Sequence, residues 1–182
     1  QVFIFNGAAM SFIDESWIEI KAGDGGAGCL SFRRERCIPK GGPDGGDGGK
    51  GGDVWFRVNP NINTLRTFVY KRHFKAKKGR NGSGSNRAGF GGEDLWMEVP
   101  LGTSIYDVTD LARDDPGDLV RDLTDPNETF CVARGGRGGQ GNVRFKTATC
   151  RAPRKTTAGE PGEMGRFRLS LKVMADVGLL GL

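Results

Sequence analysis

One stretch decides the fold of this chain: Gly41-Gly42-Pro43-Asp44-Gly45-Gly46-Asp47-Gly48-Gly49-Lys50-Gly51-Gly52. Its glycines recur at every third residue, and the block from Gly135 to Gly141 repeats the pattern. A period of three fits neither an α-helix nor a β-strand, but it is the period of a polyproline II helix. Because glycine leaves one edge of such a helix without side chains, neighbouring segments can pack closely. The blocks therefore predict a packed layer of polyproline II segments.

Two other interpretations of glycine-rich sequence fit less well. Flexible linkers favour serine beside glycine and run between domains. Here the glycine blocks are flanked by apolar alternation, as in the residues from Asp53 to Val58. Collagen needs a far longer register, and the chain has only 8 prolines.

Strand patterns dominate the rest of the chain. Apolar and polar residues alternate over six stretches, at 18–22, 54–58, 95–99, 119–123, 129–133 and 166–173. No long helical stripe occurs, although residues 63–70 could hold one helical turn, and residues 114–118 resemble a hairpin turn. These patterns predict a mainly β fold: a small antiparallel barrel or sandwich that carries the glycine-rich segments as long excursions.

The composition limits the class of protein. A length of 182 residues fits one domain, and no apolar run is long enough to span a membrane. The four cysteines show no Cys-x-x-Cys spacing and His73 is the only histidine, which argues against zinc and favours a reducing, cytoplasmic compartment. Residues 1–9 lack the basic start of a signal peptide, and we interpret them as an expression-vector remnant or an unprocessed leader.

Charge is distributed unevenly along the chain. Residues 65–92 contain eight Lys or Arg and residues 129–159 contain seven, and neither run contains an acid. The stretch between them, residues 93–128, has eleven acids and only two arginines. Long acid-free runs that include glycine-rich loops are typical of a surface that binds a polyanion.

Motifs for other chemistry fail on context. Gly-x-Gly-x-x-Gly occurs three times, but no helix pattern follows it as a dinucleotide site requires. Asp44, Asp47 and Asp53 resemble ligands of a calcium-binding repeat, but carboxylates that accept backbone N–H bonds in turns explain them better. No catalytic constellation is assembled, so we predict no catalytic and no metal-binding residues in this chain.

A nucleic-acid interface remains the best functional hypothesis from the residues. The stretch from Lys71 to Gly84 joins cations, aromatic rings and glycines, which can neutralise phosphates, stack on bases and enter a crowded cleft. We expect Phe74 to belong to the core instead. Gly82 and Gly84 should need either positive φ or side-chain-free edges. The alternative is a protein-interaction module that uses the acidic 93–128 segment.

Five motifs together carry a resemblance to a known family: Ala22-Gly23-Asp24-Gly25-Gly26, Ser31-Phe32-Arg33-Arg34-Glu35, Pro39-Lys40-Gly41-Gly42-Pro43-Asp44-Gly45-Gly46-Asp47-Gly48-Gly49, Ala133-Arg134-Gly135-Gly136-Arg137-Gly138-Gly139 and Gly159-Glu160-Pro161-Gly162-Glu163. In this order they resemble the N-terminal domain of the Obg family of ribosome-associated GTPases. Cys37, where the family usually has an aromatic residue, and a long 107–118 hairpin are small departures. The resemblance implies the Obg fold, in which six left-handed glycine-rich helices stand on an eight-stranded β-barrel.

The resemblance also implies a domain plan. Residues 10–174 would form the Obg domain, and residues 175–182 would begin a truncated GTPase domain. Gly181 would be the first glycine of its phosphate loop, without the Lys and Ser that hold phosphates and magnesium. The fragment should then be catalytically silent and bind no cofactor, whereas the parent would hydrolyse GTP with Mg²⁺.

The partners that the resemblance implies are the large ribosomal subunit, through 23S-type rRNA near the peptidyl-transferase region during late assembly, and the protein's own GTPase domain. The expected RNA contacts are the cations Arg33, Arg34, Lys71, Arg72, Lys75, Lys77, Lys78, Arg80, Arg137, Arg144 and Lys146. The expected structural glycines are Gly42, Gly45, Gly48, Gly51, Gly82, Gly84, Gly135, Gly138 and Gly141.

Overall fold

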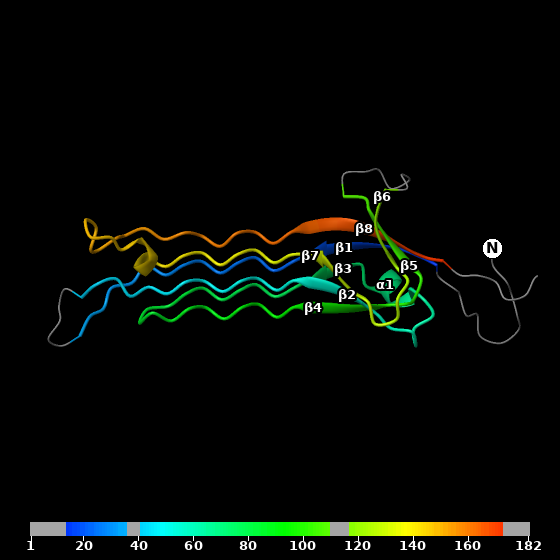
Figure 1. Cartoon of the computed structure of the whole chain (residues 1–182), viewed down its shortest axis with the longest axis horizontal. Coiled ribbons are helices and arrows are strands. Elements are labelled where there is room, and N and C mark those ends of the chain that lie inside the picture. The colour runs from blue at the N-terminus through cyan, green and yellow to red at the C-terminus, as the bar shows by residue number, and fades with distance from the viewer. Residues whose placement is uncertain (1–13, 36–40, 110–116, 173–182) are drawn as a thin grey trace, which may run out of the picture.

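The computed structural model describes residues 14–35, 41–109 and 117–172, and it is elongated (Figure 1). Extended segments lie side by side at one end, and the β-strands gather at the other. We call these extended segments the glycine-rich layer: residues 22–33, 41–53, 76–84, 86–94, 134–141 and 153–163. The sequence predictions for residues 1–9 and 175–182, including Gly181, fall outside the described residues.

The strands form two sheets. The larger sheet has the order β3-β1-β8-β5-β6, and the smaller has the order β4-β2-β7. In chain order the strands are β1 (Glu15–Lys21), β2 (Val54–Val58), β3 (His73–Lys75), β4 (Leu95–Val99), β5 (Thr103–Asp107), β6 (Asp118–Leu123), β7 (Thr129–Ala133) and β8 (Met164–Leu171). Two short helices complete the described elements: α1 (Arg66–Tyr70) and the 3₁₀ helix η1 (Asn142–Phe145).

The predicted mainly β fold is confirmed, and each of the six predicted strands overlaps an observed one. The helical turn within residues 63–70 is present as α1. The sequence patterns missed β3, which has only three residues, and β5, whose first three residues are all buried and so do not alternate. The described strands form two sheets rather than one closed ring, so the eight-stranded barrel is not confirmed.

The expected antiparallel arrangement is wrong for two strand pairs, β1–β3 and β2–β4, which are parallel. The reason lies in how the chain enters and leaves the layer. It passes out through β1, β3 and β7 and returns through β2, β4 and β8, making three excursions. Strands β1 and β3 both lead outward and strands β2 and β4 both lead back, so each adjacent pair must run in the same direction.

The sheets share one apolar core. Alternate residues of β1, β2 and β4 point into it, and Phe56, Ile18 and Val99 are fully buried or nearly so. Phe74, expected in the core, is 7% exposed and packs against Phe68 of α1 with ring centroids 5.6 Å apart. The expectation for Phe74 is therefore confirmed.

The glycine-rich layer is held by backbone hydrogen bonds between segments. Consecutive residues of the first segment bond to different neighbours: Gly25 N–H to Glu160 O and Gly26 N–H to Gly49 O, each at 2.8 Å, and Ala27 O from Gly82 N–H at 2.9 Å. The same pattern of bonds occurs three residues earlier, at residues 22–24. A segment inside the layer thus bonds to neighbours on three sides, one for each residue of a three-residue repeat.

The missing Cβ atoms make this packing possible. At seven of the nine expected structural glycines, an added Cβ would overlap a backbone oxygen of a neighbouring segment; these are Gly45, Gly48, Gly51, Gly82, Gly135, Gly138 and Gly141. Gly42 differs, because nothing lies within 4 Å of its Cβ position. At Gly84 the added atom would meet only the Ser31 side chain, with Oγ at 2.9 Å.

Positive φ, considered for Gly82 and Gly84, occurs instead at the next two residues. Ser85 has φ 60° and Asn86 has φ 56°, and they turn the chain between two layer segments. Asp44 holds this turn, because its Oδ2 accepts the Ser85 N–H at 3.1 Å and its carbonyl accepts the Asn86 N–H at 2.7 Å. Gly82 is required by close packing rather than by backbone conformation.

We expect Gly82→Ala to destabilise the fold, because its Cβ would overlap the Gly46 carbonyl oxygen. Overpacking of this kind costs about 1–3 kcal/mol. For a domain of this size that lowers the melting temperature by roughly 2–12 °C, which circular dichroism can measure. Gly42→Ala is the matched control and should melt like the wild type. Equal melting of the two variants would contradict the packing argument.

Candidate nucleic-acid interface

The end of the glycine-rich layer farthest from the sheets gathers segments that are distant in the sequence (Figure 1). We call this end the distal tip and define it as residues 31–35, 41–47, 83–88 and 142–155. Helix η1 lies there, after the fifth layer segment. Hydrogen bonds join its parts: Asp44 N–H donates to Ser31 O at 3.0 Å, and Asn86 N–H donates to Asp44 O at 2.7 Å.

The distal tip is strongly cationic. Its described residues include eight exposed cations: Arg33, Arg34, Arg87, Arg144, Lys146, Arg151, Arg154 and Lys155. They include only three acids, Glu35, Asp44 and Asp47. Glu35 pairs with Arg33 and Asp47 pairs with Arg144, each at 2.8 Å. The other cations of the tip have no ion pair within the described ranges, so the tip carries a net positive field.

A buried asparagine organises the distal tip. Asn142 is fully buried, and its side chain bonds to three different segments. Its Oδ1 accepts the Gly45 N–H at 2.9 Å, and its Nδ2 donates to Ser31 O at 2.8 Å and Pro153 O at 3.3 Å. A satisfied buried amide of this kind fixes the relative positions of the segments that carry the cations. Nothing in the sequence distinguished Asn142 from an ordinary loop residue.

The aspartates of the glycine blocks join segments across the layer. Asp47 Oδ1 accepts the Gly141 N–H at 2.8 Å, and Asp53 Oδ1 accepts the Gly135 N–H at 2.7 Å. The sequence pattern predicts carboxylates that accept backbone N–H bonds within turns. These two accept them from a separate segment, because close packing aims the N–H groups of one segment at the side chains of another. No group of three potential metal ligands occurs among the described residues.

All eleven cations expected to contact RNA are exposed, but they do not form one surface. Arg33, Arg34, Arg144 and Lys146 lie at the distal tip. A second set lies along the layer: Lys77, Lys78, Arg80 and Arg137. A third set, Lys71, Arg72 and Lys75, lies in and just before β3, beside the sheets. The expected contacts did not include four further tip cations: Arg87, Arg151, Arg154 and Lys155. These residues belong to the same acid-free runs, which could have identified them.

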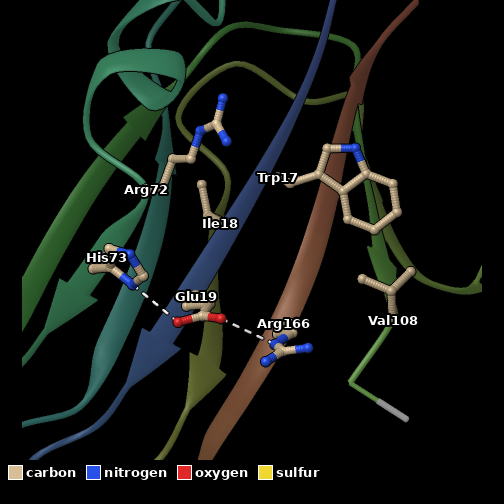
Figure 2. Close-up of a pocket in the computed structure, with 7 residues that line it drawn as sticks. All are labelled: Trp17, Ile18, Glu19, Arg72, His73, Val108 and Arg166. Atoms are coloured by element: carbon tan, nitrogen blue, oxygen red, sulfur yellow. Dashed lines mark hydrogen bonds and ion pairs between the residues drawn. The ribbon is translucent and has the colours of Figure 1, made fainter. Parts of the chain in front are cut away.

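The sheet region contains a cavity of about 220 Å³ between β1, β3 and β8 (Figure 2). Glu19 lies between His73 and Arg166 in its lining: its Oε2 is 2.9 Å from His73 Nδ1 and its Oε1 is 3.0 Å from Arg166 Nε. Arg72 lines the other side and does not join this pair. No serine or cysteine is among the described residues that line the cavity. The lining offers no hydroxyl or thiol nucleophile, and of its two arginines Arg166 is already paired with Glu19.

Three of the eight described acids of the 93–128 segment form ion pairs with nearby cations. Glu93 pairs with Lys77, Asp122 with Lys172 at 2.7 Å, and Glu128 with Arg121 at 2.8 Å. The hydrogen bond from Lys172 lowers the pKa of Asp122, which keeps that carboxylate ionised. This segment therefore presents less free negative charge than its composition suggests. No helix in the described part of the chain is long and apolar enough to cross a membrane.

The carboxylate of Asp53 should make stability depend on pH. Burial raises its pKa, but hydrogen bonds from Lys50 Nζ and Gly135 N–H lower it by more, so the pKa lies below 3.8. A carboxyl pKa that is lower in the folded state contributes stability above the unfolded value, and this contribution disappears as pH falls through the folded value. Asp53→Asn should therefore destabilise the protein at neutral pH, and its difference from the wild type should shrink below pH 3.8.

Urea unfolding across this pH range measures that difference. The matched control is Asp118→Asn, which removes an exposed carboxylate without a hydrogen bond in the described residues. Its effect should be small at every pH. A difference for Asp53→Asn that stays constant as the solution becomes acidic would contradict the charge argument.

Comparison with known proteins adds two findings. Residues 13–173 match the sequence profile of the GTP1/OBG family. The chain is also similar to the proteins named GTPase Obg from two strains of Nitratidesulfovibrio vulgaris, DP4 and Hildenborough, with 52% identity over 173 residues. That alignment covers 95% of this chain and 46% of each relative. The chain therefore spans less than half the length of these curated relatives.

Proposed function

This chain belongs to the GTP1/OBG family, and we propose that it is the ribosome-binding part of an Obg-family GTPase. In this proposal the distal tip contacts the RNA of the large ribosomal subunit. The observation that carries it is the excess of positive charge at the tip, where eight exposed cations stand against only three acids. Arg and Lys bind phosphate groups, and the release of condensed counterions from the RNA favours this binding.

The shape of the layer supports this function. Its segments hold the tip away from the sheets (Figure 1). Their glycine edges let the six segments pack within a narrow cross-section. We infer that the segments are polyproline II helices. Their bonds to neighbours repeat with period three, and Gly141 has φ −73° and ψ 164°, near the values of that helix. A narrow, rigid support would let the tip enter a folded RNA where a broad domain could not.

The remaining parts of the proposal concern the whole protein. Relatives named GTPase Obg suggest GTP hydrolysis, with GTP and Mg²⁺ bound by a GTPase domain that would be a second partner of this chain. A role in late assembly of the large subunit, with contacts to 23S-type rRNA near the peptidyl-transferase region, extends the same proposal. Such a role would place the protein in the cytoplasm.

The alternative, a protein-interaction module that uses the acidic 93–128 segment, has less support. Its surface acids are partly neutralised by Lys77, Arg121 and Lys172. Binding to large-subunit RNA freed of protein separates the two functions. RNA binding by the distal tip allows it, whereas a surface that recognises only basic proteins does not.

The position of the interface can be tested by removing three charges at either end of the layer. One variant combines Arg34→Gln, Lys146→Gln and Arg154→Gln at the tip. Its matched control combines Lys71→Gln, Arg72→Gln and Lys75→Gln beside the sheets, which changes the net charge by the same amount. We expect the tip variant to reduce the slope of log K against log salt by roughly 2–3, since each lost phosphate contact lowers it by about 0.7–0.9. The control should keep the wild-type slope.

Filter binding to protein-free large-subunit RNA gives these slopes, and thermal melting verifies that both variants fold. Equal losses in the two variants would mean that net charge, rather than the tip, determines binding. Unchanged affinity and slope in the tip variant would contradict the proposed interface.

A further inference from the structure

A second cationic site lies between the tip and the sheets. Segments 76–84 and 86–94 line a groove of about 370 Å³, which we call the mid-layer groove. Its side chains are those of Lys77, Lys78, Arg80, Phe90 and Glu93, and its remaining lining comes from glycines. Lys77 pairs with Glu93, whereas Lys78 and Arg80 have no ion pair within the described residues. The groove therefore combines unneutralised cations with an aromatic ring.

Phe90 presents its ring to solvent with no partner. The side chain is 76% exposed, and no aromatic ring or cation in the described part of the chain stacks on it. Other exposed aromatic residues differ. Tyr70, also 76% exposed, has the Arg66 guanidinium 5.7 Å from its ring centroid. Trp96 stacks on Trp55 at 5.4 Å and also contacts Arg57. A single exposed ring means little by itself, so its neighbours decide the interpretation.

The glycine beside the ring is not required by packing. At Gly89 and Gly92 an added Cβ would overlap the carbonyls of Arg80 and Lys77. At Gly91 the nearest atom would be Lys50 O at 3.7 Å, an ordinary contact, and its φ is not positive. The fold would accept a side chain at Gly91. Its absence leaves open space next to Phe90.

The fold does not need the Phe90 side chain either. The backbone carbonyl of Phe90 accepts the Arg80 N–H at 2.9 Å, a bond that any residue at this position would make. The ring buries little surface, so it adds little to stability. An exposed ring, an open glycine and two cations without an ion pair thus occur together, and packing requires neither the ring nor the glycine.

We propose that the mid-layer groove binds an unpaired nucleotide of RNA, with its base stacked on Phe90 and its phosphates near Lys78 and Arg80. This inference rests on the proposed RNA-binding function and adds a contact distinct from the distal tip. Stacking requires a free base face, which a duplex does not offer, so the groove selects single-stranded RNA. The cations neutralise the phosphates on either side of the stacked base.

The test compares the 182-residue chain and its variants by fluorescence anisotropy with labelled single-stranded oligoadenylate and with duplex RNA of equal length. Phe90→Ala should weaken single-strand binding by about 5- to 150-fold, the usual effect of removing one stacking ring. It should leave duplex binding and the salt slope unchanged, because no charge is lost. Phe90→Trp should retain single-strand binding. Tyr70→Ala, which removes an equally exposed ring beside the sheets, is the matched control and should bind like the wild type.

A second variant fills the groove without removing the ring. Gly91→Leu places a side chain beside Phe90, where the layer has room, and should weaken single-strand binding while the melting temperature stays unchanged. A Lys78→Gln and Arg80→Gln double variant should instead lower the salt slope.

Wild-type single-strand binding by both Phe90→Ala and Gly91→Leu would overturn the inference. A loss of duplex binding in Phe90→Ala equal to its loss of single-strand binding would also overturn the inference. Binding of polyglutamate but not of oligoadenylate would do the same, because the groove would then recognise an acidic peptide instead of RNA. The proposed function fails by a different result, namely unchanged affinity and salt slope in the triple variant of the tip. The two proposals can therefore be rejected separately.

Discussion

The absence of a Cβ atom at regular positions is the constraint on which the whole molecule depends. It lets a backbone N–H of one segment reach a carbonyl of the next at 2.7–3.1 Å, where any side chain would separate the two chains. Because the hydrogen bonds of an inner segment repeat every three residues, successive residues bond to different neighbouring segments. The layer is therefore a network of backbone hydrogen bonds, and its side chains can point to the surface. This explains how a region with no apolar core can still hold eight cations in a defined arrangement at its far end.

The glycine-rich layer and the sheets are also directly connected along the chain. Each layer segment runs directly into a strand, from β1 and β3 outward to β2 and β4 on the return. The register in the sheets therefore sets the register in the layer, and the core around Phe56 and Ile18 anchors both. The core fixes the segments at the sheets, and Asn142 fixes three of them at the tip through one buried amide. The intervening segments need only backbone bonds and carboxylates such as Asp47 and Asp53.

The sequence predicted the layer because its constraint is local: a glycine in every third position is visible in one segment alone. Which segments are neighbours was not predictable, since every edge of such a helix is chemically similar. For the same reason Gly42 and Gly91 looked like Gly45 and Gly92, although no close neighbour faces their missing side chains. The acid-free runs predicted a cationic surface, but they could not separate the tip cations from Lys71, Arg72 and Lys75, which the excursions leave at the opposite end. Asn142 and β5 were missed because burial from distant segments, not local pattern, determines their roles.

The paired out-and-back course of the chain has a consequence for how such proteins can change in evolution. Gly23, Gly26 and Cys29 bond in order to Gly52, Gly49 and Gly46, so each three-residue turn of an outgoing segment matches one turn of the returning segment. Inserting a single residue would move bulky side chains onto the bonded edges along the rest of that segment. Because each segment also bonds to segments outside its pair, only the addition of three residues to all six segments would restore every bond, and at the rise of a polyproline II helix it would move the tip outward by about 9 Å. The length of the layer can therefore vary only in steps of three residues, and only where all six segments lengthen together.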